Sequence, residues 1–346
     1  MNSSHKTPTS GAFGPLGLER PRFGEFAKQL AAITTCELED CLKYQSEYGG
    51  RIGAILADRK LIQQEQIPEI LRMMARWVAA TRHADMPGFG FPRPLKLSVC
   101  MPAFNEADVI EDCLAAACAI LPEFVEDFEL IIANDGSSDE TGELVHQFSQ
   151  RDPRVRLVNH EVNRGYGAAV SSGLKAAEGD LVIFTDGDGQ FSMLDLPQLL
   201  EHVNDVDYVI GYRYERAEGG LRRLNAWSWN RLIRAMLGVR VRDLDCAYKL
   251  FPRDVIEELK LTSQGACINA EILTQCARGG LTFCETPVMH YPRYHGAPTG
   301  ANLKVIIKAF RELPQLWKYR SAPPLVRSPA EQRDETPIPD KAKVSH

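Results

Sequence analysis

The segment Leu181–Gln190, LVIFTDGDGQ, decides the fold of this chain. Its first four residues are apolar and two of them are β-branched, which is typical of a buried strand. The polarity then changes at once to two carboxylates and an amide, Asp186, Asp188 and Gln190, with glycines between them. In an open parallel sheet, ligands bind beyond the carboxyl ends of the strands. We therefore expect this segment to be a strand that ends at a ligand site.

Asp186 and Asp188 are suited to share a divalent cation, because they are two residues apart at the end of that strand. Their hard oxygen ligands favour Mg²⁺ or Mn²⁺ over Zn²⁺. The intervening glycines allow a tight turn and the close approach of a phosphate. A lone Asp-x-Asp pair is also common in acidic turns that merely end a strand. The choice between these interpretations depends on the other strands.

Three further apolar segments have the same form, in that a predicted strand ends in polar residues. The strands are residues 96–101, 128–133 and 155–158, followed by PAFNE at 102–106, NDGSSD at 134–139 and NRGYG at 163–167. Helical patterns lie between the strands. This repeated alternation predicts an α/β fold, a doubly wound parallel sheet with right-handed crossovers. One edge of such a sheet would collect Glu106, Asp135, Asp186 and Asp188.

Composition and motifs exclude several classes of protein. The net charge of −6 over 346 residues gives no basic excess for a nucleic-acid partner. The chain has neither a Gly-x-Gly-x-x-Gly dinucleotide fingerprint in the right context nor a phosphate loop of the GxxxxGK[ST] type. No apolar run reaches the roughly 18 residues of a transmembrane helix. The nine cysteines form no Cys-x-x-Cys pair, so we expect reduced thiols and a cytoplasmic protein.

The motifs between residues 97 and 320 resemble, in order, those of family 2 glycosyltransferases of GT-A fold, and within them the dolichyl- or polyprenyl-phosphate sugar synthases. Besides the four strand ends, the likeness includes GYR at 211–213, DLDCAYK at 243–249, Glu271 and HYPR at 290–293. It implies a GT-A (Rossmann-like), mostly parallel sheet flanked by helices. It also implies metal-dependent, inverting transfer of a sugar from a nucleotide-sugar to a polyprenyl-phosphate or glycan acceptor. Two departures are Phe104, where the family often has Tyr, and Asn134, where it usually has Asp.

The resemblance also implies roles for individual residues. The nucleotide-sugar would be held by Pro102, Phe104, Glu106, Asp135, Gly165, Asp186 and Gln190. The metal, Mg²⁺ or Mn²⁺, would be bound by Asp186, Asp188 and Gln190, which makes Asp188 catalytic. Arg213 and Arg293 would stabilise the charge of the departing diphosphate. A polyprenyl phosphate is already an anion and needs no strong base, whereas a hydroxyl acceptor needs one, for which the candidates are Asp243, Asp245 and Glu271.

Two other classes of function compete with this interpretation. The first is a catalytically inactive effector that reads a second messenger, cyclic-di-GMP, and only binds a nucleotide-sugar. The intact Asp186, Asp188, Gln190 and Arg293 argue against it. The second is a nucleotidyltransferase, which also uses metal-binding carboxylates. That class usually has a glycine-rich, basic loop after its first strand, and residues 102–106 contain no such loop.

Two basic segments lie in the second half of the chain. Residues 213–242 contain eight arginines and no lysine. Arg216, Arg222 and Arg223, together with Arg213, suggest a loop over phosphates, whereas Arg231 and Arg234 suit the solvated face of a helix. Trp227 and Trp229 fit either an acyl-chain contact or the core. Residues 303–318 predict a basic amphipathic helix, which fits either peripheral contact with the inner face of a membrane or packing on the sheet.

The N-terminal part of the chain contains a tandem repeat. Arg22-Phe-Gly24 recurs as Arg51-Ile-Gly53, and each copy opens a unit of a short and a longer helix. The repeat resembles the cyclic-di-GMP-binding N-terminal domain of type II secretion and pilus-assembly ATPases. That resemblance implies cyclic-di-GMP binding by Arg22, Gly24, Gln45, Arg51 and Gly53, and regulation of the catalytic domain. The departures are Ala31 and Lys60 in place of the mid-motif glycine and Met74 in place of the closing Gln, so a domain that kept only the fold is the alternative.

These patterns predict five segments along the chain. Residues 1–18 are expected to be disordered, and residues 19–82 to form the helical tandem-repeat domain. The Pro/Gly-rich residues 83–95 read as a linker. Residues 96–320 would form the GT-A domain, and the Pro-rich, charged residues 321–346 a disordered tail.

Overall fold

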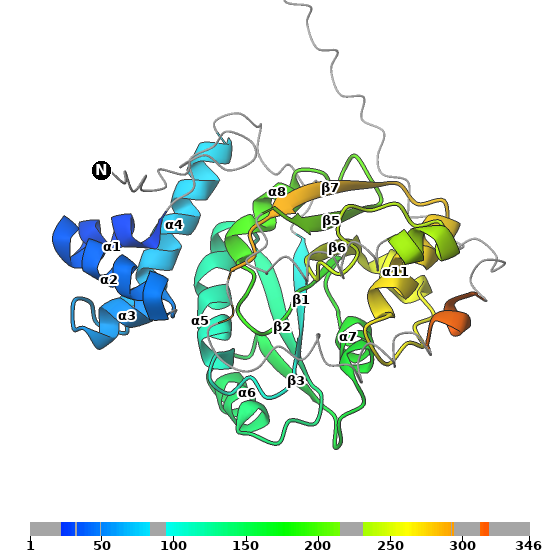
Figure 1. Cartoon of the computed structure of the whole chain (residues 1–346), viewed down its shortest axis with the longest axis horizontal. Coiled ribbons are helices and arrows are strands. Elements are labelled where there is room, and N and C mark those ends of the chain that lie inside the picture. Colours follow the sequence, from blue (N-terminus) through cyan, green and yellow to red (C-terminus); the bar gives the residue numbers. More distant parts are fainter. Residues whose placement is uncertain are drawn as a thin grey trace, which may run out of the picture.

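The computed structural model describes residues 22–31, 33–48, 50–83, 95–214, 231–291, 293 and 312–317. They form a small helical unit at the N-terminal end and a larger α/β unit beside it (Figure 1). Arg216, Arg222, Arg223, Trp227 and Trp229, and most of the predicted amphipathic helix at 303–318, lie outside the described residues. Arg231 and Arg234 lie exposed on a helical turn, in agreement with a solvated face.

The α/β unit is built on a seven-stranded sheet in the order β3-β2-β1-β4-β6-β5-β7. The strands are β1 Lys96–Ala103, β2 Asp127–Asn134, β3 Val155–Asn159, β4 Leu181–Phe184, β5 Tyr208–Arg213, β6 Lys249–Pro252 and β7 Phe283–Val288. Strands β1 to β4 pair in parallel, as do β5 and β7, whereas β6 is antiparallel to both β4 and β5. The predicted mostly parallel sheet of a GT-A fold is confirmed.

Helices cover both faces of this sheet. They are α5 Ile110–Ile120, α6 Thr141–Arg151, α7 Tyr166–Lys175, α8 Leu196–Leu200, α10 Arg253–Glu258 and α11 Ile268–Arg278, with short 3-10 turns η1 Leu121–Glu123 and η2 Met193–Asp195. Alternate residues of β1 point to opposite faces, as strand geometry requires. Val99 and Met101 join the core under α5, and Cys100 joins the core with α7 and α11 (Figure 1). Both faces are therefore buried, which explains the continuous apolar runs in the sequence.

The N-terminal unit consists of four helices around a core of its own. They are α1 Phe23–Ala31, α2 Thr35–Tyr48, α3 Ile52–Asp58 and α4 Gln66–His83. The equivalent repeat positions Ile33 and Ile62 are both buried in that core. A β-carbon at Gly24 would lie 2.5 Å from Leu38 Cδ1, and one at Gly53 would lie 3.0 Å from Phe23 Cζ. The glycines of the repeat are thus needed for close helix packing, with or without a ligand.

Helix α4 joins the two units. Ala75 and Val78 on α4 are buried in the same core as α5 and the sheet. Arg76 Nε donates to Glu123 Oε1 at 3.0 Å across the same boundary. Leu194, which follows β4, packs in turn against the core of the helical unit. The helical unit is therefore docked on the α5 side of the sheet.

Candidate active site

The loops that follow β1, β2 and β4 meet at one edge of the sheet. The backbone N–H of Asp135 donates to Ala103 O at 2.9 Å, and that of Gly187 to Pro102 O at 3.3 Å. These bonds tie both acidic loops to the end of β1. The loops that carry the four predicted acidic residues therefore lie together at one edge of the sheet: Glu106, Asp135, Asp186 and Asp188.

Asp186 and Asp188 form a partly enclosed acidic pair at the end of β4. Burial raises the pKa of both carboxyls, and the charge of Asp188 raises the pKa of Asp186 further. Asp186 Oδ1 accepts a hydrogen bond from Tyr166 Oη at 2.9 Å, and Asp188 Oδ1 accepts one from the backbone of Gln190 at 3.0 Å. A divalent cation would relieve the repulsion between the two carboxylates, so this pair fits Mg²⁺ or Mn²⁺.

Gln190, the third residue expected to bind the metal, makes a hydrogen bond to another segment of the chain. Gln190 Nε2 donates to the backbone oxygen of Tyr291 at 2.9 Å, which ties the loop after β4 to the segment after β7. No group of three His, Cys, Asp or Glu side chains in the described ranges has the arrangement of a metal site. The roles of Asp186, Asp188 and Gln190 as metal ligands stay predictions.

Arg293 bridges two of the acidic residues across a long sequence separation. Its Nη2 makes a short hydrogen bond to Glu106 Oε1, and its Nη1 lies 3.7 Å from Asp188 Oδ2. Burial raises the pKa of Glu106, while the charge and hydrogen bond of Arg293 oppose that shift. Arg293 thus brings a positive charge to the place where a diphosphate would lie beside the metal pair.

Asp135 organises the neighbouring loop. Its carboxylate accepts hydrogen bonds from the backbone of Arg164 at 2.9 Å and of Gly165 at 2.8 Å, and its Oδ1 lies 2.8 Å from His160 Nδ1. Gly165 has φ +105°, a conformation that favours glycine. Because Tyr166 follows directly, the loop held by Asp135 also positions the hydroxyl that contacts Asp186. Phe104 is 37% exposed at the rim of the same edge.

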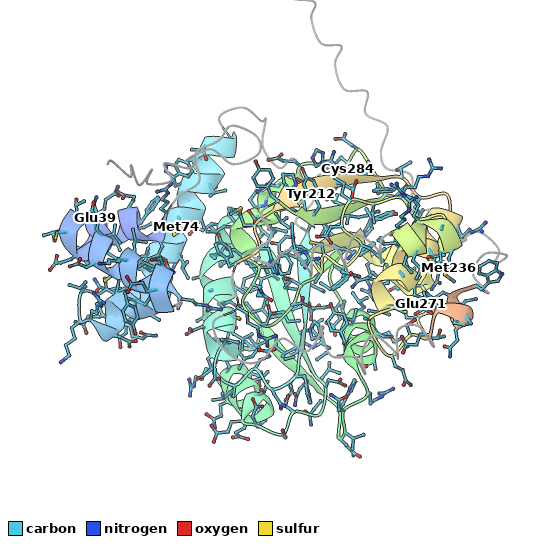
Figure 2. All side chains as sticks on the ribbon, in the orientation of Figure 1. Glu39, Met74, Tyr212, Met236, Glu271 and Cys284 are labelled. Atoms are coloured by element: carbon cyan, nitrogen blue, oxygen red, sulfur yellow. The ribbon has the colours of Figure 1, made fainter. Side chains whose placement is uncertain are left out.

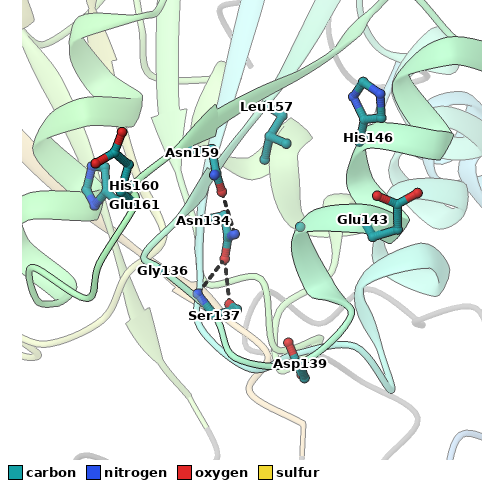
Figure 3. Close-up of a pocket in the computed structure, with 11 residues that line it drawn as sticks. Asn134, Gly136, Ser137, Asp139, Glu143, His146, Leu157, Asn159, His160 and Glu161 are labelled. Atoms are coloured by element: carbon teal, nitrogen blue, oxygen red, sulfur yellow. Dashed lines mark hydrogen bonds between the residues drawn. The ribbon is translucent and has the colours of Figure 1, made fainter.

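The departure at Asn134 has a structural reason. Asn134 Nδ2 donates to Asn159 Oδ1 at 2.7 Å, and its Oδ1 accepts from the backbone N–H of Ser137 at 3.3 Å (Figure 3). An aspartate could not donate the first of these bonds. Asn134 lines a polar pocket of about 410 Å³ at the ends of β2 and β3. The amide of Asn134 therefore links the ends of β2 and β3 through a hydrogen bond that an aspartate could not donate.

Two predicted catalytic carboxylates are occupied by protein donors. Asp243 makes a bidentate pair with Arg213, with Nε at 2.7 Å and Nη2 at 2.8 Å. Glu271 accepts from the backbone N–H groups of Thr262 at 3.0 Å and Ser263 at 2.8 Å. Arg213 also lowers the pKa of Asp186, so the pair lies within electrostatic reach of the metal edge. The role of either carboxylate as a base stays a prediction.

Several residues near the site were not singled out from the sequence. Tyr166 lies inside the NRGYG motif and Lys249 ends the DLDCAYK motif, so their positions carried a signal, whereas His160 carried none that distinguished it. Lys249 is fully buried, and its Nζ donates to Asn269 Oδ1 at 2.7 Å and lies over the ring of Phe184. Burial lowers the pKa of Lys249, and Lys249 in turn lowers the pKa of Asp186. All nine cysteines are free thiols.

The second repeat of the helical unit reaches this site. Arg51 Nη2 donates to Cys113 Sγ at 3.3 Å, and Arg51 Nη1 lies 3.5 Å from Asp112 Oδ2 on α5. Gly189, between Asp188 and Gln190, has φ +73°, and a β-carbon there would collide with the Arg51 guanidinium. Arg51 therefore lies against the acidic loop itself.

Four of the five residues predicted to bind cyclic-di-GMP, namely Arg22, Gln45, Arg51 and Gly53, line one cavity between the two units. Gln45 Nε2 donates to the backbone oxygen of Gly50 at 2.8 Å. Gly24 is buried beneath Leu38.

Comparison with known proteins matches the larger part of the α/β unit to a family. Residues 98–260 match glycosyl transferase family 2. That segment contains β1 to β6 and the loops with Glu106, Asp135, Asp186 and Asp188. The resemblance noted from the sequence motifs is therefore correct at the level of the family, and the segment is a family 2 glycosyltransferase domain.

Relatives match more than half of the chain. A dodecaprenyl-phosphate galacturonate synthase from Rhizobium johnstonii is 30% identical over 58% of this chain and 61% of its own length. A dolichyl-phosphate beta-glucosyltransferase from Trichomonas vaginalis is 31% identical over 57% of this chain and 66% of its own. Glycosyltransferase AglD from Haloferax volcanii is 31% identical over 58% of this chain and 34% of its own. The chain thus spans between one third and two thirds of these relatives.

A solved structure shares the fold. Glucosyl-3-phosphoglycerate synthase from Mycobacterium tuberculosis, crystallised with Mn²⁺, UDP and glucosyl-3-phosphoglycerate, aligns with a TM-score of 0.52. The alignment covers 73% of this chain and 85% of that protein at 20% identity.

Within the described part of the chain, no helix has both the length and the apolar character needed to cross a bilayer.

Proposed function

We propose that this protein is a metal-dependent, inverting glycosyltransferase that moves a sugar from a nucleotide-sugar to a polyprenyl phosphate. The observation that carries this proposal is the Asp186–Asp188 pair with Arg293 beside it, at the carboxyl edge of a family 2 domain. Relatives named for dodecaprenyl-phosphate and dolichyl-phosphate products support the acceptor class. The structural neighbour crystallised with Mn²⁺ and UDP is consistent with the donor and the metal.

The residues of the chain have distinct tasks in this reaction. Asp186 and Asp188 would hold the metal, which supplies positive charge to the leaving diphosphate. Arg293 adds a second cation at the same place, and its bond to Glu106 fixes the guanidinium. Asp135 holds the loop that carries Tyr166, whose hydroxyl fixes Asp186. These contacts orient the metal-binding side chains before the donor arrives.

Two of the three candidate bases, Asp243 and Glu271, are occupied by protein donors, which favours a phosphate acceptor over a hydroxyl acceptor. A hydroxyl must lose its proton to a base, whereas a phosphate monoester is already an anion at neutral pH. Asp243 is paired with Arg213, and Glu271 is engaged by Thr262 and Ser263. Such an acceptor is a membrane lipid, and we propose that the protein works as a peripheral protein at the cytoplasmic face of a membrane. Co-sedimentation with polyprenyl-phosphate vesicles tests this location.

The decisive experiment is transfer from a panel of nucleotide-sugars to undecaprenyl phosphate with Mn²⁺ or Mg²⁺. We expect one nucleotide-sugar to be consumed, with loss of activity when the metal is chelated. Asp188→Ala should abolish transfer while the far-UV circular dichroism stays native. Near-normal transfer by that variant would contradict the metal assignment. Binding of a nucleotide-sugar without turnover would instead support the inactive-effector alternative.

We further propose that the helical unit binds cyclic-di-GMP and thereby regulates transfer. Arg22, Gln45 and Arg51 face one cavity, and Arg51 also contacts the catalytic loop. A ligand of this unit can shift the catalytic domain only through different affinities for two states. Calorimetric titration of the full chain with cyclic-di-GMP, with Arg22→Ala as the comparison, tests the proposal. Absence of heat at micromolar ligand would remove it.

A further inference from the structure

A cavity of about 680 Å³ lies between the helical unit and the α/β unit. Its volume is typical of sites that enclose a small molecule or part of a larger one. The walls are largely apolar and come from α4, α5 and the segment after β4; they include Leu71, Met74, Ala116, Ile120, Met193 and Leu194. Figure 2 shows Met74 on α4, on the side of the helical unit that faces the α/β unit. Neither unit alone encloses this space.

The same cavity reaches the metal edge. Thr185, Asp186 and Gly189 line it, so the apolar space is continuous with the loop that carries the acidic pair. Thr185 is 1% exposed, and its Oγ1 has no hydrogen-bond partner within the described ranges. A buried hydroxyl without a partner costs free energy, which a polar group of a ligand would remove. The cavity therefore fits a molecule with a long apolar body and a polar head.

We propose that the apolar part of this cavity, lined by α4, α5 and the segment after β4, holds the isoprenoid chain of the acceptor, with the acceptor phosphate at the Asp186 end; Arg22 and Gln45, which we propose to bind cyclic-di-GMP, are not part of this lining. The inference rests on the proposed function, because a polyprenyl phosphate is the reactant that combines an apolar chain with an anionic head. Arg51 lines the cavity beside Gly189, so a guanidinium is present near the position of the phosphate. The helical unit thus forms one wall of the acceptor site.

Chain-length selectivity tests this assignment on the full chain. The wild type should use undecaprenyl phosphate with a kcat/KM at least about tenfold above that for dimethylallyl phosphate, because more apolar surface is buried. Ala116→Leu places extra volume in the cavity and should reduce this ratio about tenfold. Ala80→Leu makes the same change at an exposed position of α4 and should leave the ratio unaltered. An equal ratio in the two variants would overturn the proposal.

Photo-crosslinking gives a readout that does not depend on turnover. A benzophenone-bearing polyprenyl phosphate should label peptides of α4 and α5, and Ala116→Leu should weaken the labelling. Labels that map only outside these helices overturn the cavity assignment, even if sugar transfer is observed. The cavity assignment would also be overturned if cyclic-di-GMP displaced the labelling and undecaprenyl phosphate did not. If no nucleotide-sugar is consumed with any acceptor, the proposed function itself fails, and native-like labelling of α4 and α5 would still support a prenyl-lipid site.

Discussion

Replacing Asp243 by asparagine is the sharpest test of how the structure uses its carboxylates. The side chains of Arg213 and Asp243 are only 11% and 4% exposed, and Asp243 also accepts from the Arg213 backbone N–H at 3.3 Å. Asp243→Asn keeps the shape but leaves a buried guanidinium facing an amide. Breaking a buried pair from one side costs roughly 3–5 kcal/mol. At about 2–4 °C per kcal/mol for a domain of this size, Tm should fall by about 6–20 °C.

Glu257→Gln provides a matched control for this measurement. Arg253 Nε and Glu257 Oε1 are 2.8 Å apart, close to the 2.7 Å of the buried pair, but the two side chains are 45% and 59% exposed. Exposed pairs contribute about 0.2–1 kcal/mol, so Tm should fall by less than about 4 °C. Thermal unfolding followed by circular dichroism distinguishes the two cases. A loss in Asp243→Asn no larger than in Glu257→Gln would refute the reasoning.

The same variant separates a structural from a catalytic role of Asp243. If Asp243 only holds Arg213, the pH profile of kcat/KM should keep its shape in Asp243→Asn while its height falls. A general base must be ionised to act, so its removal would abolish the acidic limb of that profile. The double variant Arg213→Met/Asp243→Asn should also lose less stability than the sum of the single variants, because the partners are coupled. Additive losses would show that they act independently.

Three further predictions concern the metal pair, the loop and the repeat. Burial raises the pKa of Asp186 and Asp188, so protons compete with the metal at higher pH than they would for exposed carboxylates. The affinity for Mn²⁺, measured by calorimetry, should therefore fall between about pH 8 and about pH 6. A constant affinity would contradict this prediction. Gly189→Ala should destabilise the protein by about 1–3 kcal/mol because Gly189 has a positive φ and contacts Arg51. The loss of Tm caused by Gly189→Ala should be smaller in a protein that also carries Arg51→Ala. Equal losses with and without Arg51→Ala would exclude the contact. Thr34→Ala removes the capping box with Glu37, so the free energy of unfolding in urea should fall by about 1 kcal/mol. Lys43→Ala, at an exposed position of α2, is the control and should leave that free energy unchanged.

Local patterns were sufficient to predict the four strands β1 to β4 and the functional edge at their ends, but not β5, β6 and β7. The runs around Val99, Ile131 and Ile183 are apolar on both faces because helices cover both, and polarity changes where each strand leaves the core. The antiparallel strand β6 was not predicted. It has four residues, and one of them is the buried Lys249, whose partners come from elsewhere in the chain. A strand of four residues that begins with a charged residue has no signal of its own.

The sequence indicated which types of side chain lie near the site, but not which of their carboxylates already accept hydrogen bonds from other parts of the protein. Acidic residues at Asp243 and Glu271 suggest bases because a carboxylate is chemically able to accept a proton. Whether it is available depends on donors brought by other segments. Arg213 precedes Asp243 by 30 residues, and Thr262 precedes Glu271 by nine. Packing, which no local pattern reports, determines which of these groups meet.

Arg51 has consequences beyond its own repeat. The sequence marks it as a possible nucleotide ligand, but the structure places its guanidinium against Asp112, Cys113 and the loop at Gly189. One guanidinium cannot keep these contacts and also turn fully toward a ligand held by the helical unit. A ligand that draws Arg51 away must therefore change the surroundings of Asp188, whose pKa the charge of Arg51 lowers. Regulation and catalysis would then be coupled through a single side chain, without any requirement for the two units to separate.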